Sequence, residues 1–295
     1  MNEPLVEISL LRREFREKVA LRSVSLKIPR GGVYGLVGGN GAGKTTLIRH
    51  ILGLFQPQFG TVRVFGLDPC AAPERVLAKI GYLSEDRDLP QWMRVDELVR
   101  YTRAFYPDWD PAYADELTAA FDLPTTQKVK SLSRGQLARL GLLLALAHRP
   151  ELLVLDEPSS GLDPVVRRDI LAAVIRTVAD EGRTVLFSSH LLDEVERVAD
   201  RVCMLHAGRV VLDDTVENIK ATHRVVTIRF PASHDRAPTL EGCFPLTGGG
   251  AEWKYLARGD GRELAELAGE QSASLVDETS PTLDDVFVGQ SGGRT

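Results

Sequence analysis

The sequence predicts an α/β fold in which helices cover a largely parallel sheet. Short, almost wholly apolar runs recur along the 295 residues and alternate with longer runs of helical periodicity. Strands of this kind are typical of a sheet that is buried on both faces. We expect the strands at VSLKI (24–28), VYGLVG (33–38), LLVLDE (152–157), TVLFSSH (184–190) and RVCMLH (201–206).

Helices are expected between these strands at 44–54 and 164–182. From about Asp86 to Pro150 only helical periods remain, and Pro107, Pro111 and Pro124 mark helix ends or first turns. The sequence therefore predicts an inserted helical subdomain at about 86–150. Its helices are expected at VDELVRYTRAFY (95–106), PAYADELTAAFD (111–122) and RGQLARLGLLLALAH (134–148).

After about Lys220 the pattern changes again, which predicts a small α+β appendage. An alternating run, VVTIRF, is followed by a glycine-rich segment, LTGGGAEW, which we expect to form a turn. Two further helical segments, GRELAELAG (261–269) and PTLDDVF (281–287), follow it. We predict one domain at 1–218 and an accessory domain at 219–295.

Composition weighs against several functional classes without excluding them. The formal net charge is −5, and Lys and Arg do not cluster as phosphate neutralisation in a nucleic-acid site would require. Cys70, Cys203 and Cys243 lack zinc or redox spacing, which favours a reducing, cytoplasmic setting. The N-terminal segment lacks the pattern of a signal peptide, and the longest apolar run, LGLLLALA, is far shorter than the ~20 residues of a membrane span.

The segment GGNGAGKTT has the pattern of a phosphate-binding loop. Gly38 to Thr45 fit G-x-x-x-x-G-K-[ST] between an expected strand and an expected helix, the context that this motif requires. Lys44 is expected on the β and γ phosphates and the Thr45 hydroxyl on Mg²⁺. The alternative is a glycine-rich turn with a solvated lysine. The predicted nucleotide contacts here are Gly38, Asn40, Gly41, Ala42, Gly43, Lys44, Thr45 and Thr46.

Three polar residues follow the ends of two expected strands. Asp156 and Glu157 close an apolar run, at the edge of the sheet where ligands collect in α/β folds. Asp156 is expected to hold Mg²⁺ and Glu157 to deprotonate the attacking water. His190 would lie near the γ-phosphate if its strand neighbours that of Asp156. A structural histidine and two solvated acids are the alternatives.

These motifs together resemble the nucleotide-binding domain of an ABC transporter. The loop at 38–45, LSRGQ (132–136), LLVLDEP (152–158), SSGLD (159–163) and His190 match the family in order and spacing over roughly the first 215 residues. The resemblance implies an ABC-type P-loop NTPase fold with a helical subdomain. It also implies ATP and Mg²⁺ as cofactors and ATP hydrolysis coupled to transport.

The resemblance identifies LSRGQ as the family's signature, which serves the nucleotide of a partner subunit. Ser133 is a plausible N-cap of the helix that follows, so its hydroxyl and the first free N–H groups form an anion site. Two copies, or two related chains, facing head to tail would each bury one ATP. An ordinary capped helix is the alternative, which explains Ser133 but not Gly135 and Gln136.

Further positions carry over from the family one at a time. Phe15 falls where the family places an aromatic ring against adenine, and Asp163 where it bridges the two subunits. Asp163 before Pro164 also reads as a helix N-cap. Glu85 stands where glutamine is common, so metal contact and a catalytic role could persist although the amide donor is lost. Arg134 replaces the signature's usual glycine.

The variations resemble exporters of bacteria whose ATPase and permease are separate chains. FYPDWD (105–110) and TLDDVF (282–287) favour this branch. It implies an integral-membrane permease as partner, and hence attachment to the inner face of the cell membrane. Trp92 and Met93 are the interface candidates, whereas Tyr101 and Phe105 are expected in the subdomain core.

Two other functions stay open at this point. A soluble ATPase acting on ribosomes or nucleic acid would usually need two such domains, long coiled coils or a basic surface, and the sequence has none. A nucleotide-sensing module could dispense with a catalytic base. Lys44, Asp156, Glu157 and His190 are all present, which favours hydrolysis.

Overall fold

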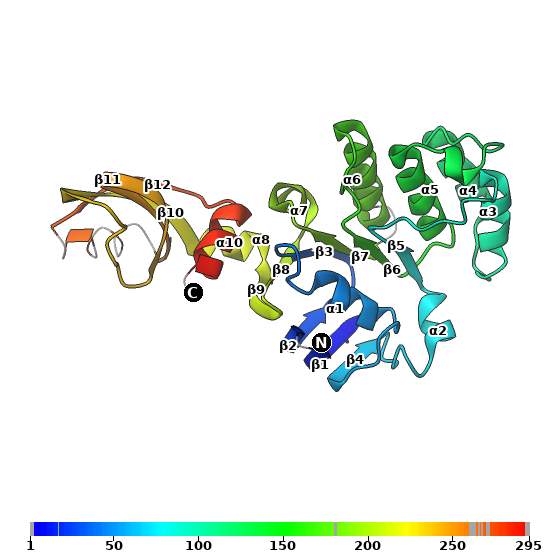
Figure 1. Cartoon of the computed structure of the whole chain (residues 1–295), viewed down its shortest axis with the longest axis horizontal. Coiled ribbons are helices and arrows are strands. Elements are labelled where there is room, and N and C mark those ends of the chain that lie inside the picture. The colour runs from blue at the N-terminus through cyan, green and yellow to red at the C-terminus, as the bar shows by residue number, and fades with distance from the viewer. Residues whose placement is uncertain are drawn as a thin grey trace.

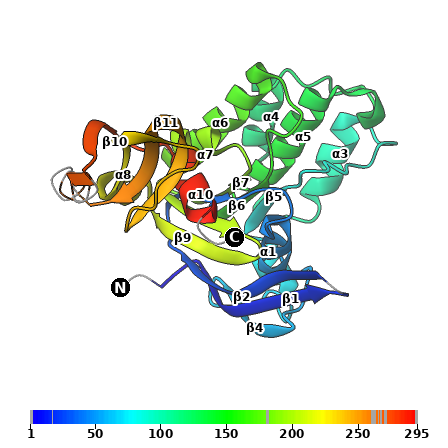
Figure 2. The same ribbon diagram turned by 60° about the vertical axis from the view of Figure 1, so that its left-hand side comes forward.

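The computed structural model describes residues 3–16, 18–179, 182–259, 264, 266, 268, 269 and 272–292, with only the backbone at 177–179, 291 and 292. Its described strands form three sheets (Figure 1). The central sheet lies between a helical layer formed by α3, α4 and α5, residues 95–146, and a sheet built from the C-terminal residues (Figure 2).

The central sheet has the strand order β5-β6-β7-β3-β8-β9. All neighbours run parallel except β8 and β9, which are antiparallel. β6 and β7 are buried along their whole length, as an apolar strand in a covered sheet should be. The strands are β3 (Gly32–Val37), β5 (Ile80–Leu83), β6 (Leu152–Asp156), β7 (Thr184–Ser189), β8 (Arg201–His206) and β9 (Arg209–Thr215).

Side chains on the two faces of this sheet enter different cores. Leu153 and Leu155 of β6 pack with the helical subdomain and α6 (Pro164–Ala179). Leu152 and Val154 pack with α1 (Lys44–Ile51) and the N-terminal strands. Both faces are therefore covered, as predicted. Two further helices, α2 (Pro73–Leu77) and α7 (Leu192–Val198), flank the sheet.

The expected strand VSLKI lies in a different sheet from the one predicted. It forms the end of β2 (Lys18–Ile28), which pairs antiparallel with β1 (Val6–Phe15); β1 also pairs with β4 (Phe59–Val64). Val24, Leu26 and Ile28 are buried while Ser25 and Lys27 are exposed. This alternation is typical of a sheet with one solvent-exposed face. The prediction that this strand belongs to the central sheet was therefore wrong.

The stretch from 86 to 150 is helical, as expected. Its elements are α3 (Val95–Arg103), α4 (Pro111–Ala120), a short 3-10 turn at Val129–Ser131 and α5 (Arg134–Leu146). Asp110 caps α4, accepting a hydrogen bond from the Tyr113 N–H at 3.0 Å, with Pro111 in the first turn. The bounds 86 and 150 themselves stay a prediction.

The expectations for aromatic and Met side chains in this layer were partly wrong. Tyr101 and Phe105, expected in the core, are 51% and 61% exposed and pack edge to face on each other. Met93, expected at the surface, is buried in the core that includes residues of α3 and α5, whereas Trp92 is 71% exposed. The core of this layer is filled instead by leucines of α5 and by Trp109. Tyr101 and Phe105 therefore lie where a partner could reach them.

The C-terminal sheet has the order β11-β10-β12. The glycine run forms a turn, as predicted, although it lies within the bounds of β11: a Cβ on Gly248 would lie 2.6 Å from the carbonyl oxygen of Glu252, four residues further on, which an extended strand could not reach. The expected helix at 261–269 lies largely outside the described residues. The elements are α8 (Val216–Thr222), β10 (His223–His234), β11 (Cys243–Arg258), β12 (Ser274–Thr279) and α10 (Leu283–Gly292).

The C-terminal elements are joined to the central sheet through α7. Glu196 of α7 accepts a hydrogen bond from the Leu283 N–H at 3.0 Å and pairs with Lys220 at 2.6 Å. The predicted domain boundary between residues 218 and 219 falls within α8. The division into two domains stays a prediction. None of the helices described is both long enough and apolar enough to cross a membrane.

Candidate nucleotide site

A cavity of about 240 Å³ opens where the N-terminal sheet meets the central sheet. Its wall is formed by the loop between β3 and α1, by the ends of β1 and β2, and by residues that follow β5 and β6. Most of the nucleotide contacts predicted from the sequence line it. The lining residues are Phe15, Lys18, Ala20, Asn40, Gly41, Ala42, Gly43, Lys44, Thr45, Thr46, Glu85 and Glu157.

Two glycines allow the loop between β3 and α1 to pass close to other backbone. Gly38 has φ 156°, and a Cβ there would lie 2.3 Å from the Leu205 carbonyl oxygen. Gly43 has φ 112°, and a Cβ would lie 2.8 Å from the Ala20 carbonyl oxygen. α1 starts directly after Gly43 with no side-chain cap, so its first N–H groups face the cavity without a capping acceptor.

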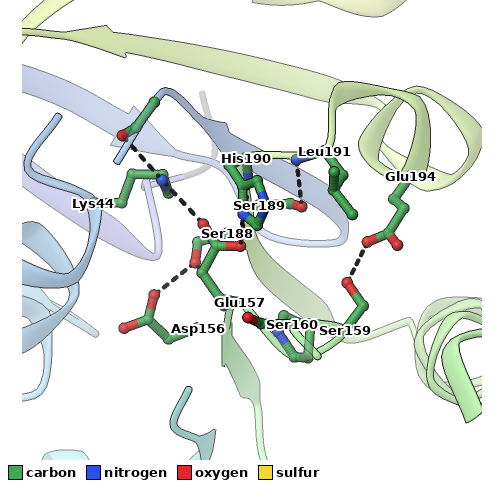
Figure 3. A network of polar contacts seen from close by, with 12 residues as sticks. Lys44, Asp156, Glu157, Ser159, Ser160, Ser188, Ser189, His190, Leu191 and Glu194 are labelled. Carbon is green, nitrogen blue, oxygen red and sulfur yellow. Dashed lines mark hydrogen bonds and ion pairs between the residues drawn. The ribbon is translucent and has the colours of Figure 1, made fainter. Parts of the chain in front are cut away.

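The Lys44 side chain is buried and already partnered. Its Nζ donates to the carbonyl oxygens of Gly38 at 2.7 Å and Gly39 at 3.4 Å. It also forms an ion pair with Glu157 Oε1 at 3.0 Å, and both side chains are 6% exposed (Figure 3). Because little water reaches either charge, the attraction between the two groups and their hydrogen bonds must offset the cost of burying them.

Glu157 lies between this lysine and His190. Its Oε2 accepts hydrogen bonds from His190 Nδ1 at 2.6 Å and from the His190 N–H at 3.3 Å (Figure 3). Strand β7, which ends before His190, pairs with β6, which ends before Glu157, so the condition set from the sequence for His190 is met. Glu157 itself has φ 48°, a conformation that costs a non-glycine residue about 1–3 kcal/mol and is typical of functional sites.

Asp156 is buried at the bottom of the same site. Ser188 Oγ donates to its Oδ1 at 2.7 Å, and the Thr45 side chain is a second hydrogen-bond partner. Burial raises the pKa of Asp156, the hydrogen bonds from Ser188 and Thr45 oppose that rise, and the charge of Glu157 adds to it. A cation bound to the carboxylate would relieve the cost of burying its charge.

Glu85 reaches the cavity from the segment after β5. Burial raises the pKa of its carboxyl, and the negative charges of Glu157 and Asp156 raise it further. Glu85 and Glu157 therefore both line the cavity, and the charge of Lys44 opposes the rise in the pKa of Glu85. Carboxylates this close together repel one another, so a bound cation would stabilise their charged forms.

The signature residues lie elsewhere, since none of Ser133, Gly135 and Gln136 lines this cavity. Ser133 Oγ accepts from the Gln136 N–H at 3.2 Å, and Gln136 Oε1 accepts from the Ser133 N–H at 2.9 Å, which is a capping box. The sequence argument that a capped helix leaves Gln136 unexplained was therefore wrong. Gly135 also has a structural reason, because its Cβ would lie 2.8 Å from Val166 Cγ2.

Asp163 caps α6, as its position before Pro164 predicted. Its Oδ1 accepts from the N–H groups of Val165 and Val166 at 2.9 and 3.1 Å. The Arg134 guanidinium lies 3.6 Å from the point where a Cβ on Gly161 would be, so the signature packs on the loop before α6. The signature and this loop form one exposed face of the chain.

Several residues of the site escaped the sequence argument. Lys18 and Ala20 line the cavity, and Ser159 donates to the buried carboxylate of Glu194 on α7, which Arg167 approaches to 3.6 Å (Figure 3). Ser188 is the partner shared by Asp156 and Glu157. The paired serines before His190 were a usable signal, because polar residues at the end of an apolar strand face the ligand edge of the sheet.

Replacing Ser188 with Ala is expected to lower the turnover number for ATP about 10-fold. The Ser188 hydroxyl both donates to Asp156 Oδ1 and accepts from the Glu157 N–H at 3.0 Å, so its loss frees the two acids to move. Phosphate release at saturating ATP measures the effect. Ser189→Ala is the matched control, because the Ser189 hydroxyl accepts a hydrogen bond from the Leu191 N–H at 2.9 Å and contacts neither Asp156 nor Glu157 in the described part of the chain.

The comparisons with known proteins agree with this geometry. The sequence model described as "ABC transporter" matches residues 21–160. The uncharacterized ABC transporter ATP-binding protein YhaQ of Bacillus subtilis is 30% identical over 98% of this chain and 99% of its own length. The chain belongs to the ABC transporter family.

Other ABC transporter proteins also match this chain. The ABC transporter ATP-binding protein YtrB of Bacillus subtilis is 29% identical over 98% of this chain and 99% of its own length. A solved structure titled "Structure of ATP binding subunit of ABC transporter" is 29% identical, with a TM-score of 0.68, and the match covers 74% of this chain and 92% of that one. This ABC transporter chain is an ATP-binding subunit and an ATPase with the cassette's P-loop NTPase fold.

Proposed function

We propose that the cavity at the β3–α1 loop holds ATP and that Glu157 activates the water that attacks the γ-phosphate. The observation that carries this proposal is the position of Glu157, whose two carboxylate oxygens contact Lys44 and His190. Lys44 would move to the β and γ phosphates when ATP enters, which frees Glu157 Oε1 to accept a proton from water. His190 would keep Oε2 fixed and place its other ring nitrogen toward the phosphate.

The residues at the end of the cavity fit a Mg²⁺ ion. Mg²⁺ takes oxygen ligands, commonly one or two carboxylates together with substrate phosphates. The Thr45 hydroxyl and the Asp156 carboxylate are hydrogen-bonded to each other, and Glu85 supplies a further oxygen at the cavity wall. When bound, the ion would neutralise charge on the β and γ phosphates. Asp156 and Thr45 would hold it, and Ser188 would hold Asp156.

The signature supports a second part of the proposal, that two chains close head to tail on each ATP. Ser133 stands at the start of a 13-residue helix and does not line the chain's own cavity. A phosphate at that helix start would therefore come from the nucleotide of another chain. Asp163, on the same face, would lie at the contact between the two. ATP would add contacts to both chains, and loss of the γ-phosphate would remove them.

The helical layer offers a surface for a separate membrane permease. An apolar groove of about 440 Å³ runs between this layer and the central sheet, lined by Leu54, Tyr82, Leu89 and Tyr106 among others. Trp92, Tyr101 and Phe105 are exposed in the same layer. Aromatic side chains of this kind are enriched at protein interfaces. Through such a permease the chain would lie at the inner face of the cell membrane and power transport.

Light scattering of the Glu157→Gln variant tests this function. With ATP and Mg²⁺ its mass is expected to double, because closed dimers would accumulate when hydrolysis stops. Adding Ser133→Arg should abolish the doubling. Adding Ser131→Arg should not, because the Ser131 hydroxyl donates to the Lys128 carbonyl oxygen and takes no part in the helix cap. A mass that ATP leaves unchanged, both alone and with the co-expressed permease, would contradict head-to-tail closure.

A further inference from the structure

Phe15 lies at the edge of the nucleotide cavity with a second aromatic ring beside it. Its side chain is 38% exposed and lines the cavity. The ring of Phe55, which follows α1, contacts it edge to face, with 5.6 Å between centroids. Phe55 is not among the lining residues of the cavity, so it supports Phe15 rather than facing the ligand.

Arg13 completes this cluster. Its guanidinium carbon lies 4.6 Å from the centroid of Phe15 and 4.8 Å from that of Phe55. Arg13 Nη1 makes one long hydrogen bond, 3.4 Å to the Gln56 carbonyl oxygen, and the buried Nε has no hydrogen-bond partner among the described residues. The guanidinium therefore makes few hydrogen bonds and lies against two aromatic rings instead, which is the geometry of a cation–π contact.

The backbone beneath the two rings is also fixed. The Gln58 side-chain amide makes two hydrogen bonds to the Glu14 backbone. Its Oε1 accepts from the Glu14 N–H at 2.7 Å, and its Nε2 donates to the Glu14 carbonyl oxygen at 3.2 Å. Glu14 immediately precedes Phe15 at the end of β1. The segment 55–58 thus contacts the ring of Phe15 through Phe55 and holds the backbone of the preceding residue, Glu14, through Gln58.

We propose that Arg13, clamped between Phe15 and Phe55, is a positioning residue that sets the Phe15 ring to receive the nucleotide base. The proposal rests on the proposed nucleotide site. Arg13 is outside the cavity and acts through Phe15. A cation on one side of the ring draws electron density from it, which favours offset stacking of a second π-system on the free face. The clamp also removes the rotamer freedom that base binding would otherwise have to remove.

Calorimetric titration with two probes, ATP and inorganic tripolyphosphate, tests the clamp. Tripolyphosphate has no base, so it reports the phosphate loop alone. Arg13→Gln keeps the length of the side chain without its charge, and it is expected to weaken ATP binding about 3- to 10-fold while tripolyphosphate binding stays within 2-fold. Phe55→Leu should give the same pattern. In steady-state kinetics KM for ATP should rise with kcat unchanged.

Arg12→Gln is the matched control. Arg12 is the neighbouring arginine; its guanidinium pairs with the Glu14 carboxylate and lies 5.9 Å from the ring of Phe59. Its loss should leave both probes unaffected. Equal loss of both probes in Arg13→Gln and Phe55→Leu, or no loss of ATP binding in either, would overturn the clamp. Failure of the wild-type chain to bind either probe would instead overturn the proposed nucleotide site.

Discussion

Replacing Glu157 with Gln is expected to lower the rate of ATP hydrolysis about 10²- to 10⁴-fold, the usual contribution of a general base. The amide keeps the size of the side chain but cannot take a proton from water. It can still accept a hydrogen bond from His190 Nδ1, now 2.6 Å from Oε2, so the site should keep its shape. Phosphate release at saturating ATP and calorimetric ATP binding measure the two effects separately.

Glu151→Gln is the matched control for this substitution. Glu151 directly precedes β6, at the opposite end of the strand from Glu157, and pairs with Lys79 and Arg30 at the surface. Its conversion should leave hydrolysis unchanged, because surface ion pairs contribute little. If Glu157→Gln retained more than about a tenth of the wild-type rate, Glu157 would not be the base and the role would pass to another group of the site.

Much of the cavity could be predicted because its residues are close together in sequence. The loop at 38–45 and the pair Asp156–Glu157 each need only local structure, a strand followed by a turn. His190 required one topological fact, that β6 and β7 are neighbours, which two apolar strands of similar length made plausible. Such features can be predicted from the sequence without knowledge of the packing around them.

Features that depend on packing could not be predicted. Tyr101 and Phe105 have the spacing of one helix face, but that face is exposed, and other residues, among them leucines of α5 and Trp109, form the core. The ion pair between Lys44 and Glu157 joins residues 113 positions apart, and the positive φ of Glu157 has no sequence signal. The clamp on Phe15 likewise needs residues 13, 55 and 58 brought together by β1 and the segment after α1.

Replacing Lys44 with Ala is expected to abolish measurable ATP binding and, without nucleotide, to lower the free energy of unfolding by about 3 kcal/mol. The first effect follows from loss of the cation for the phosphates. The second follows from the pair with Glu157, since removing one partner leaves a carboxylate that is 6% exposed and keeps only its hydrogen bonds from His190 among the described residues. Urea unfolding and calorimetric titration measure the two effects.

The double variant Lys44→Ala, Glu157→Gln separates them. An amide carries no charge to desolvate, so the double variant should regain most of the lost stability, yet ATP should still not bind. Lys79→Ala is the control, since its pair with Glu151 is about half exposed on both sides and should contribute at most about 1 kcal/mol. If Glu157→Gln restored no stability, the Lys44–Glu157 pair would have no energetic weight in the nucleotide-free chain. Moving Lys44 from Glu157 to the phosphates would then cost no free energy from the loss of that pair.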